Sequence, residues 1–213
     1  MGTSGSGKST LLNILGCLDT PTSGEYLLDD IPVRTMSKPQ RAVLRNRKIG
    51  FVFQSYNLLP KTTAVENVEL PLMYNSAVSA SERRRRAIES LQAVGLGDRL
   101  EHKSNQMSGG QMQRVAIARA LVNNPAVILA DEATGNLDKE NGRRATAILY
   151  DISKAGTTVV LSTHNEELIS EFPGVVYRCG EGRLQECTDT YTPLLAPDAI
   201  ESKSIEENIN ENN

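Results

Sequence analysis

The sequence predicts an α/β fold in which helices cover both faces of a mostly parallel sheet. Short apolar segments of strand length alternate with longer segments whose apolar residues recur at helical spacing, and parallel strands need such connecting helices. A glycine-rich run, "MGTSGSGKST", leads directly into the first helical segment. In a chain of 213 residues with 39% hydrophobic content, the apolar surface is sufficient to bury a core.

The first quarter of the chain predicts a helix, a turn, a small hairpin, a second helix and a buried strand. The first helix is expected over residues 8–18, with its end near Gly16, and the turn over 19–25. The hairpin is expected over 25–33, around Asp29 and Asp30. The second helix is expected over 37–47, with Ser37 as its cap, and the strand over 49–53, before Gln54. Ser37 suits the cap because its hydroxyl can accept from a free N–H group of the first turn.

The middle of the chain predicts a helical subdomain over about residues 55–122, inserted between strands of the sheet. Residues 63–95 have a helical pattern that Pro71 breaks, and the stretch "NSAVSAS" suggests flexibility. A further helix follows over residues 109–122.

The C-terminal part returns to alternating strands and helices. The predicted elements are a strand over 126–130, a helix over 139–155, a strand over 157–162 and a final strand pair over 175–179 and 182–186, around Gly180 and Gly182. We therefore expect one domain over residues 1–187. Residues 188–213 are polar and rich in Asn and acidic residues, a composition typical of a disordered tail.

The glycine-rich run fits the pattern GxxxxGK[ST], with Gly2, Gly7, Lys8 and Ser9 at the fixed positions. This pattern predicts a P-loop NTPase, because the backbone N–H groups of such a loop and the dipole of the following helix face the phosphates. Lys8 would neutralise the β- and γ-phosphates, and the Ser9 hydroxyl would ligate Mg²⁺. The residues expected to contact the nucleotide are Gly2, Thr3, Ser4, Gly5, Ser6, Gly7, Lys8, Ser9 and Thr10.

Two adjacent carboxylates follow the apolar segment "AVILA". Asp131 at the strand end can hold Mg²⁺ through water, and Glu132 can accept a proton from an attacking water. The alternative is that the pair only caps a helix. The phosphate loop in the same chain favours the nucleotide-site interpretation.

A second glycine-rich segment, Ser108-Gly109-Gly110-Gln111, opens another helix. Its N-terminus predicts a second anion-binding site. A single chain that binds one nucleotide does not need two anion-binding helix N-termini.

With these three motifs the sequence resembles the ABC-type ATPases, whose LSGGQ signature corresponds here to Met107–Gln111. The resemblance implies a homodimer that encloses two ATP molecules, each between the phosphate loop of one subunit and the signature segment of the other. It also implies that Gln54 senses Mg²⁺ and the partner, that Asp138 belongs to the dimer-contact loop, and that His164 contacts the γ-phosphate.

The resemblance extends the set of expected site residues beyond the phosphate loop. The catalytic residues would be Glu132, His164, Gln54 and Lys8. The Mg²⁺ site would include Ser9, Gln54 and Asp131. The further nucleotide contacts would be Ser108, Gly109, Gly110, Gln111 and Asp138. The implied cofactors are ATP and Mg²⁺.

From Met1 to about Leu184, the chain is similar to the subfamily of lipoprotein-releasing and macrolide-export transporters. The segments that carry this likeness are "LLNILGCLDTPTSGE", "RNRKIGFVFQSYNLLP", "AVENVELPL" and "DEATGNLD". Three positions depart from the family pattern: Met107 replaces leucine, Ala133 replaces proline and Asn165 replaces aspartate. None of these changes removes a catalytic group.

The resemblance implies an ATP-hydrolysing subunit that energises a membrane permease. We expect residues 56–60 and 64–73 to dock a cytoplasmic helix of that permease. The alternative is that Leu58 and Leu59 only pack inside the helical subdomain. For the function of the chain, the alternatives are an ABC ATPase without a transport role, such as one acting in DNA repair or translation, and an inactive truncated fragment.

The charge balance gives no sign of a nucleic-acid partner, since the net charge is −3 and the isoelectric point is about 5.5. We interpret the basic run Arg83–Arg86 as a solvated helix face. Three cysteines at unrelated spacings suit a reducing cytosol. No stretch of the sequence is long and apolar enough to span a bilayer, so we expect any link to a membrane to go through a partner. The resemblance implies that this partner is the permease, which would hold a cytoplasmic chain at the inner face of the membrane.

The resemblance also implies that a buried strand and an adenine-stacking aromatic residue precede Met1, so the chain is expected to be N-terminally truncated. Without that strand we expect a gap in the middle of the sheet and unpaired backbone groups, each costing about 1–3 kcal/mol where buried. Protein that starts at Met1 is then expected to be poorly soluble and to bind ATP weakly.

Overall fold

A three-stranded parallel sheet lies at the centre of the structure, a computed structural model that describes residues 5–188. Its strands are β3 (Ile49–Phe53), β4 (Val127–Asp131) and β5 (Thr158–Ser162), with β4 in the middle. The register pairs Phe53 with Asp131 and Asp131 with Ser162, so the three strands end at the same edge. These strands confirm the predicted parallel sheet.

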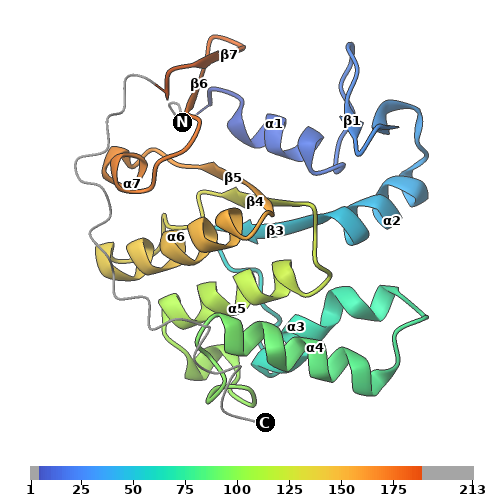
Figure 1. The fold of residues 1–213 in the computed structure, drawn as a ribbon, viewed down its shortest axis with the longest axis vertical. Helices are drawn as coiled ribbons and strands as arrows, with labels where there is room; N and C mark the ends of the chain where they lie inside the picture. Colours follow the sequence, from blue (N-terminus) through green and yellow to red (C-terminus); the bar gives the residue numbers. More distant parts are fainter. Residues whose placement is uncertain (1–4, 189–213) are drawn as a thin grey trace.

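Helices cover both faces of this sheet (Figure 1). On one side lie α1 (Lys8–Leu15) and α2 (Lys38–Lys48), and on the other lie α5 (Gly109–Leu121) and α6 (Lys139–Lys154). Strand β4 is buried between the layers, which explains its continuous apolar sequence. Gly50 in β3 allows α5 to approach closely, because an added Cβ would lie 2.5 Å from the carbonyl oxygen of Ala120.

The predicted hairpin forms as β1 (Leu27–Leu28) and β2 (Ile31–Pro32), with Asp29 and Asp30 in its turn. The 3₁₀ turn η1 (Val33–Thr35) then leads to α2. A buried cluster that includes Leu12, Leu44 and Leu129 joins α1, α2 and the sheet.

The predicted helical segments lie at one end of the structure and pack on α5 (Figure 1). They comprise α3 (Ala64–Glu69), the 3₁₀ helix η2 (Leu70–Tyr74), α4 (Ala80–Ala93) and the 3₁₀ turn η3 (Ser104–Gln106). The break at Pro71 is confirmed, since the α-helix ends at Glu69 and a 3₁₀ helix continues the chain. Reciprocal side-chain and backbone bonds between Thr63 and Glu66 begin α3.

One α-helix within residues 5–188 was not predicted from the sequence. Helix α7 (Glu166–Glu171) follows β5 and begins at Asn165, whose side-chain oxygen accepts from the backbone N–H groups of Glu167 and Leu168. A helix of 6 residues is too short to establish a helical hydrophobic period. The final predicted pair is confirmed as β6 (Tyr177–Gly180) and β7 (Arg183–Glu186).

Among residues 5–188, β5 pairs with β4 alone, so its other edge carries no strand. A groove of about 600 Å³ lies along this edge, between α1, α6, α7 and β6. Strands β3, β4 and β5 pair without interruption, so no gap separates these three strands. The segment predicted to precede Met1 and the tail over 189–213 lie outside the described residues.

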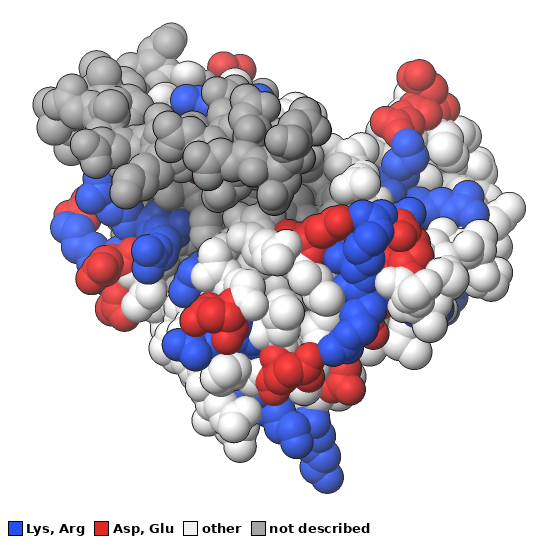
Figure 2. Space-filling view, turned by 60° about the horizontal axis from the view of Figure 1, so that its bottom comes forward, with Lys and Arg blue, Asp and Glu red and all other residues white. Residues whose placement is uncertain are grey.

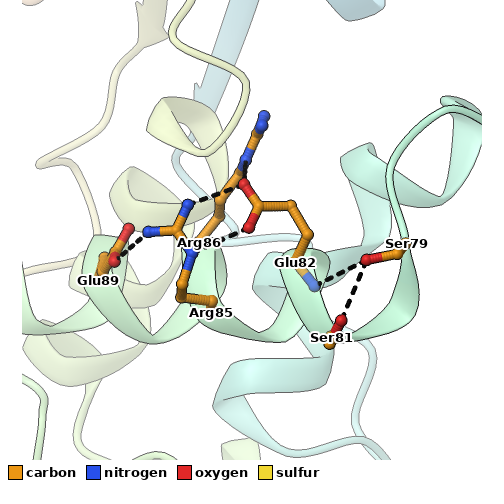
Figure 3. A network of polar contacts seen from close by, with 6 residues as sticks. All are labelled: Ser79, Ser81, Glu82, Arg85, Arg86 and Glu89. Carbon is orange, nitrogen blue, oxygen red and sulfur yellow. Dashed lines mark hydrogen bonds and ion pairs between the residues drawn. The ribbon is translucent and has the colours of Figure 1, made fainter.

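Three of the four arginines in the basic run on α4 pair with neighbouring acidic side chains, as expected for a solvated helix face. Arg85 and Arg86 donate to Glu82, and Arg85 also donates to Glu89 (Figure 3). Arg84 pairs with Glu101 at 2.6 Å. Figure 2 shows basic and acidic side chains interspersed over the lower face of the molecule. Separately, no helix within residues 5–188 has the length and hydropathy needed to cross a bilayer.

The network on α4 predicts an unusually acidic carboxyl group. Hydrogen bonds from Arg85 and Arg86 lower the pKa of Glu82 from 4.5 to about 2. Because this folded-state pKa lies below the unfolded value, the stabilisation is complete above pH 4.5 and is lost as the pH falls toward 2. A carboxyl ¹³C NMR titration should therefore give a midpoint well below 4.5 for Glu82.

Salt provides the control for this prediction. At about 1 M salt, where the Debye length is ~3 Å, the midpoint should move upward because exposed ion pairs are screened. In Glu82→Gln, the acid-dependent loss of stability between pH 4.5 and 2 should be smaller. An ordinary midpoint for Glu82 at low salt would contradict the network.

Candidate nucleotide-binding site

The phosphate loop begins at the edge of the described residues, since Gly2, Thr3 and Ser4 lie outside them. Gly5 and Gly7 have φ values of 78° and 97°, a left-handed backbone that glycine adopts without a Cβ penalty. Gly7 is the N-terminal cap of α1, so Lys8, Ser9 and Thr10 form the first turn. Their free N–H groups and the helix dipole can therefore meet an anion beside the loop.

Lys8 and Ser9 contribute side chains from this first turn. The Lys8 ammonium lies 3.5 Å from the Ser6 hydroxyl. The Ser9 hydroxyl donates to Asp131 Oδ2 at 3.3 Å. The structure thus brings together the two motifs that the sequence separates by 122 residues.

Asp131 is also held from the neighbouring strand. The Ser162 hydroxyl donates to Asp131 Oδ1 at 2.6 Å, and it accepts from the backbone N–H of Glu132 at 2.9 Å. The next residue, Glu132, has a φ of 45°, which is uncommon for a residue with a side chain. Sequence reasoning did not identify Ser162, because its role depends on the pairing of β4 with β5.

The donor set at this point suits Mg²⁺. A carboxylate and a hydroxyl offer hard oxygen ligands, and Mg²⁺ in nucleotide sites takes one or two protein ligands together with water and substrate phosphates. Within residues 5–188 there is no cluster of three or more His, Cys, Asp or Glu side chains that could hold a metal by themselves. Ser9 and Asp131 therefore fit a metal that arrives with its nucleotide.

Gln54 and the loop after Glu132 form a second link at the same edge of the sheet. Gln54 Nε2 donates to Asn136 Oδ1 at 3.2 Å, and Asn136 Nδ2 donates to the backbone oxygen of Gln54 at 3.1 Å. Gly135 is required by this contact, because an added Cβ would lie 2.6 Å from Gln54 Nε2. The role of Asn136 was not predicted from the sequence, although this residue lies in the segment "GNLD", two residues before Asp138.

The signature segment begins α5 with a reciprocal cap. The Ser108 hydroxyl accepts from the backbone N–H of Gln111 at 3.2 Å, and the Gln111 side chain accepts from the Ser108 N–H at 2.9 Å. Gly109 lies beside the Tyr56 hydroxyl, and Gly110 lies against Asn141. Since α1 and α5 lie on opposite sides of the sheet (Figure 1), this segment does not meet the phosphate loop within the chain.

Asp138 and His164 occupy exposed positions in the loops that follow the sheet. Asp138 caps α6, accepting from the backbone N–H of Asn141 at 2.9 Å and from its side chain at 2.7 Å. These bonds, the backbone one foremost, lower the pKa of the Asp138 carboxyl. His164 lies between β5 and α7, and Asn165 after it caps α7.

A family model described as ABC transporter matches residues 1–135. The chain belongs to the ABC transporter family. The family predicted from the sequence is thereby confirmed.

The curated relatives of this ABC transporter chain include cassettes and larger proteins. It is 57% identical over 185 residues to an uncharacterized ABC transporter ATP-binding protein of Thermotoga maritima, covering 87% of this chain and 78% of the relative. It is 51% identical over 196 residues to the macrolide export ATP-binding/permease protein MacB of Brucella melitensis, covering 91% of this chain and 30% of the relative. The macrolide-export relatives fit the predicted subfamily.

A solved structure supports the fold of this ABC transporter chain. The ATP-binding cassette MJ0796, described as a dimer in a post-hydrolysis state with bound ADP and Pi, superposes with a TM-score of 0.77 at 47% identity. The match covers 87% of this chain and 83% of that chain. The predicted P-loop NTPase fold is therefore confirmed.

The contact between the signature segment and α6 gives a prediction about stability. A Cβ added at Gly110 would lie 2.2 Å from Asn141 Oδ1 and 2.5 Å from its Cγ. Gly110→Ala should therefore lower the free energy of unfolding by about 1–3 kcal/mol, as overpacking typically does. Urea unfolding measures this loss.

Gly174→Ala is the matched control, because a Cβ at Gly174 meets no atom within 4 Å and the residue has no positive φ. Its midpoint should stay close to that of the wild type. Equal unfolding midpoints for the Gly110 and Gly174 variants would contradict the close contact between α5 and α6.

Proposed function

We propose that this chain binds and hydrolyses ATP with Mg²⁺ and supplies the energy for a membrane transporter. The observation that carries the proposal is the link from Ser9 through Asp131 to Ser162, which joins the phosphate loop to the strand carrying the two carboxylates. The family match and the names of the relatives support the same function.

In the proposed mechanism, the phosphate loop binds and orients the nucleotide. The N–H groups at the start of α1 and the Lys8 ammonium would bind the phosphates, and Ser9 with Asp131 would hold Mg²⁺. When bound, Mg²⁺ would neutralise negative charge on the phosphates. The Glu132 carboxylate accepts the proton of the attacking water, while Gln54 and His164 orient water and γ-phosphate.

The proposed active unit is a homodimer. Because the sheet separates α1 from α5 (Figure 1), one chain does not enclose a nucleotide between its two helix N-termini. A second copy can place its Ser108–Gln111 segment and Asp138 against the nucleotide held by the first chain's loop. The solved relative MJ0796 is described as dimeric, which supports this assembly.

The partner proposed for force transmission is a membrane permease. The Brucella relative is named an ATP-binding/permease protein, which supports such a partner for this chain. In this role the chain lies at the cytoplasmic face of the membrane, held there by the permease. ATP-driven closure of the dimer would move the permease, and hydrolysis would reopen the dimer.

The permease contact is best placed in a groove of about 710 Å³ between α2, β3, η2 and α5. Aromatic residues of β3 lie along the groove, and Val43 and Tyr74 at its edges are 52% and 84% exposed. Arg45 and Arg47 add positive charge. An amphipathic cytoplasmic helix with acidic residues fits these features.

This location revises part of the sequence-based expectation. Leu58 packs against the core, so it does not offer a docking surface, whereas Leu59 is exposed. The backbone of Tyr56 and Asn57 is held in place by Arg119, which donates to both of their carbonyl oxygens at 2.8 and 2.6 Å. Of this loop only Asn57 lines the groove, and Tyr74 is the most exposed aromatic residue there.

Substitution of the proposed base tests the hydrolytic mechanism. Glu132→Gln should lower kcat by about 10²–10⁴-fold, because the amide cannot accept the water's proton. Nucleotide affinity should persist, since Lys8, Ser9 and Asp131 are unchanged. Phosphate release measures turnover, and light scattering should detect an ATP-bound dimer.

Glu140→Gln is the control for charge removal, because Glu140 is exposed in the first turn of α6. It should hydrolyse ATP at the wild-type rate. Near wild-type turnover in Glu132→Gln would remove Glu132 from the role of base.

Photocrosslinking tests the proposed permease contact. A benzoylphenylalanine introduced at Tyr74 should capture the permease when the two are purified together, because Tyr74 lies at the groove. The same group at Val175, which is 65% exposed and outside this groove, should not. Capture from Val175 alone, or capture of only a second copy from Tyr74, would contradict the groove as the docking surface.

A further inference from the structure

Ser162 joins the two adjacent carboxylate residues through one hydroxyl group. It is the last residue of β5 and pairs in register with Asp131, the last residue of β4. Its side chain is buried, at 7% exposure. The hydroxyl donates to Asp131 Oδ1 at 2.6 Å and accepts from the N–H of Glu132 at 2.9 Å.

We propose that Ser162 is a positioning residue for ATP hydrolysis, acting through both Asp131 and Glu132. It fixes the rotation of the Asp131 carboxylate and the backbone from which the Glu132 side chain projects. This inference rests on the proposed function, because it concerns how the metal ligand and the base of that reaction are oriented.

The first part of the argument concerns Asp131. The carboxylate of an aspartate at a strand end can rotate about its side-chain bonds. Its two oxygens are therefore interchangeable unless a hydrogen bond fixes one of them. Ser162 occupies Oδ1, which leaves Oδ2 facing the Ser9 hydroxyl at 3.3 Å. A bond from a hydroxyl to an ionised carboxylate is among the stronger hydrogen bonds in proteins. Ser162 thus selects the oxygen that faces the proposed metal.

The second part concerns Glu132. Its φ of 45° is a backbone conformation that residues with a side chain rarely adopt and that the surroundings must enforce. Its N–H group finds an acceptor in the Ser162 hydroxyl. Loss of that acceptor would leave the N–H without its strand-end partner and would release the constraint on where Glu132 projects.

The dual role requires a hydroxyl that donates and accepts at once. Threonine retains both functions and suits a strand, whereas alanine retains neither. The neighbouring Thr163 does not duplicate the contact, because its hydroxyl accepts from the N–H of Asn165. The hydroxyl next to Ser162 in the sequence therefore has a different partner.

The test compares Ser162→Ala and Ser162→Thr with the wild type in the full chain. Ser162→Ala should lower kcat by about tenfold or more, the effect expected when a hydrogen bond to a charged group is lost. Affinity for Mn²⁺ with a non-hydrolysable ATP analogue, followed by Mn²⁺ electron paramagnetic resonance, should fall by a similar factor. Analogue affinity without a divalent cation should not change, because Ser162 contacts no predicted phosphate-binding group.

Thr146→Val is the matched control for burial of a hydroxyl. Thr146 is 3% exposed, and its hydroxyl donates within α6 to the carbonyl oxygen of Gly142. This variant should match the wild type in kcat and Mn²⁺ affinity, with any stability change seen by urea unfolding. Ser162→Thr should restore most of both quantities.

Three results would overturn the inference: wild-type kcat and Mn²⁺ affinity in Ser162→Ala, equal losses in Thr146→Val, or no rescue by Ser162→Thr. Failure of the proposed function has a different signature, namely a wild-type chain that releases no phosphate from ATP. In that case the Mn²⁺ affinities of wild type and Ser162→Ala still decide whether Ser162 orients Asp131. A wild type that binds no Mn²⁺ with the analogue would overturn both proposals.

Discussion

The hydrogen-bonded carboxylate of Asp131 is the point on which the candidate site depends. One of its oxygens faces the Ser9 hydroxyl on α1, and the other accepts from Ser162 on β5. The first contact requires α1 to pack on β4, and the second requires β4 to pair with β5 in this register. The buried apolar core of β4, from Ile128 to Ala130, secures that register. Packing in the sheet therefore determines the geometry of the polar groups at its edge.

The two candidate nucleotide-binding segments of the chain lie on opposite sides of the sheet. The phosphate loop begins α1 on one side, and the signature segment begins α5 on the other (Figure 1). Close packing keeps them there, since Gly50 lets α5 approach β3 and Gly110 lets it approach α6. In this arrangement the proposed site would be completed by a second copy. The dimer proposed above follows from this separation.

Charged residues serve different purposes on two parts of the surface. On α4, Arg85 and Arg86 are neutralised by Glu82 within the same helix (Figure 3), so they offer little attraction to an external partner. In the groove beside α2, Arg45 and Arg47 lie near exposed apolar side chains. The combination of basic and apolar groups is what a docking surface requires.

The sequence by itself determined the order and type of most elements and the residues of the candidate motifs. Local signals carried these predictions: caps such as Ser37, the break at Pro71 and the apolar segment before Asp131. Tertiary structure alone decided which side chains meet. Ser162 lies 31 residues from Asp131 and Asn136 lies 82 residues from Gln54, so their contacts depend on strand order and register. Helix α7 and the groove beside α2 were also missed, because neither a 6-residue helix nor a surface between distant segments leaves a periodic signal in the sequence.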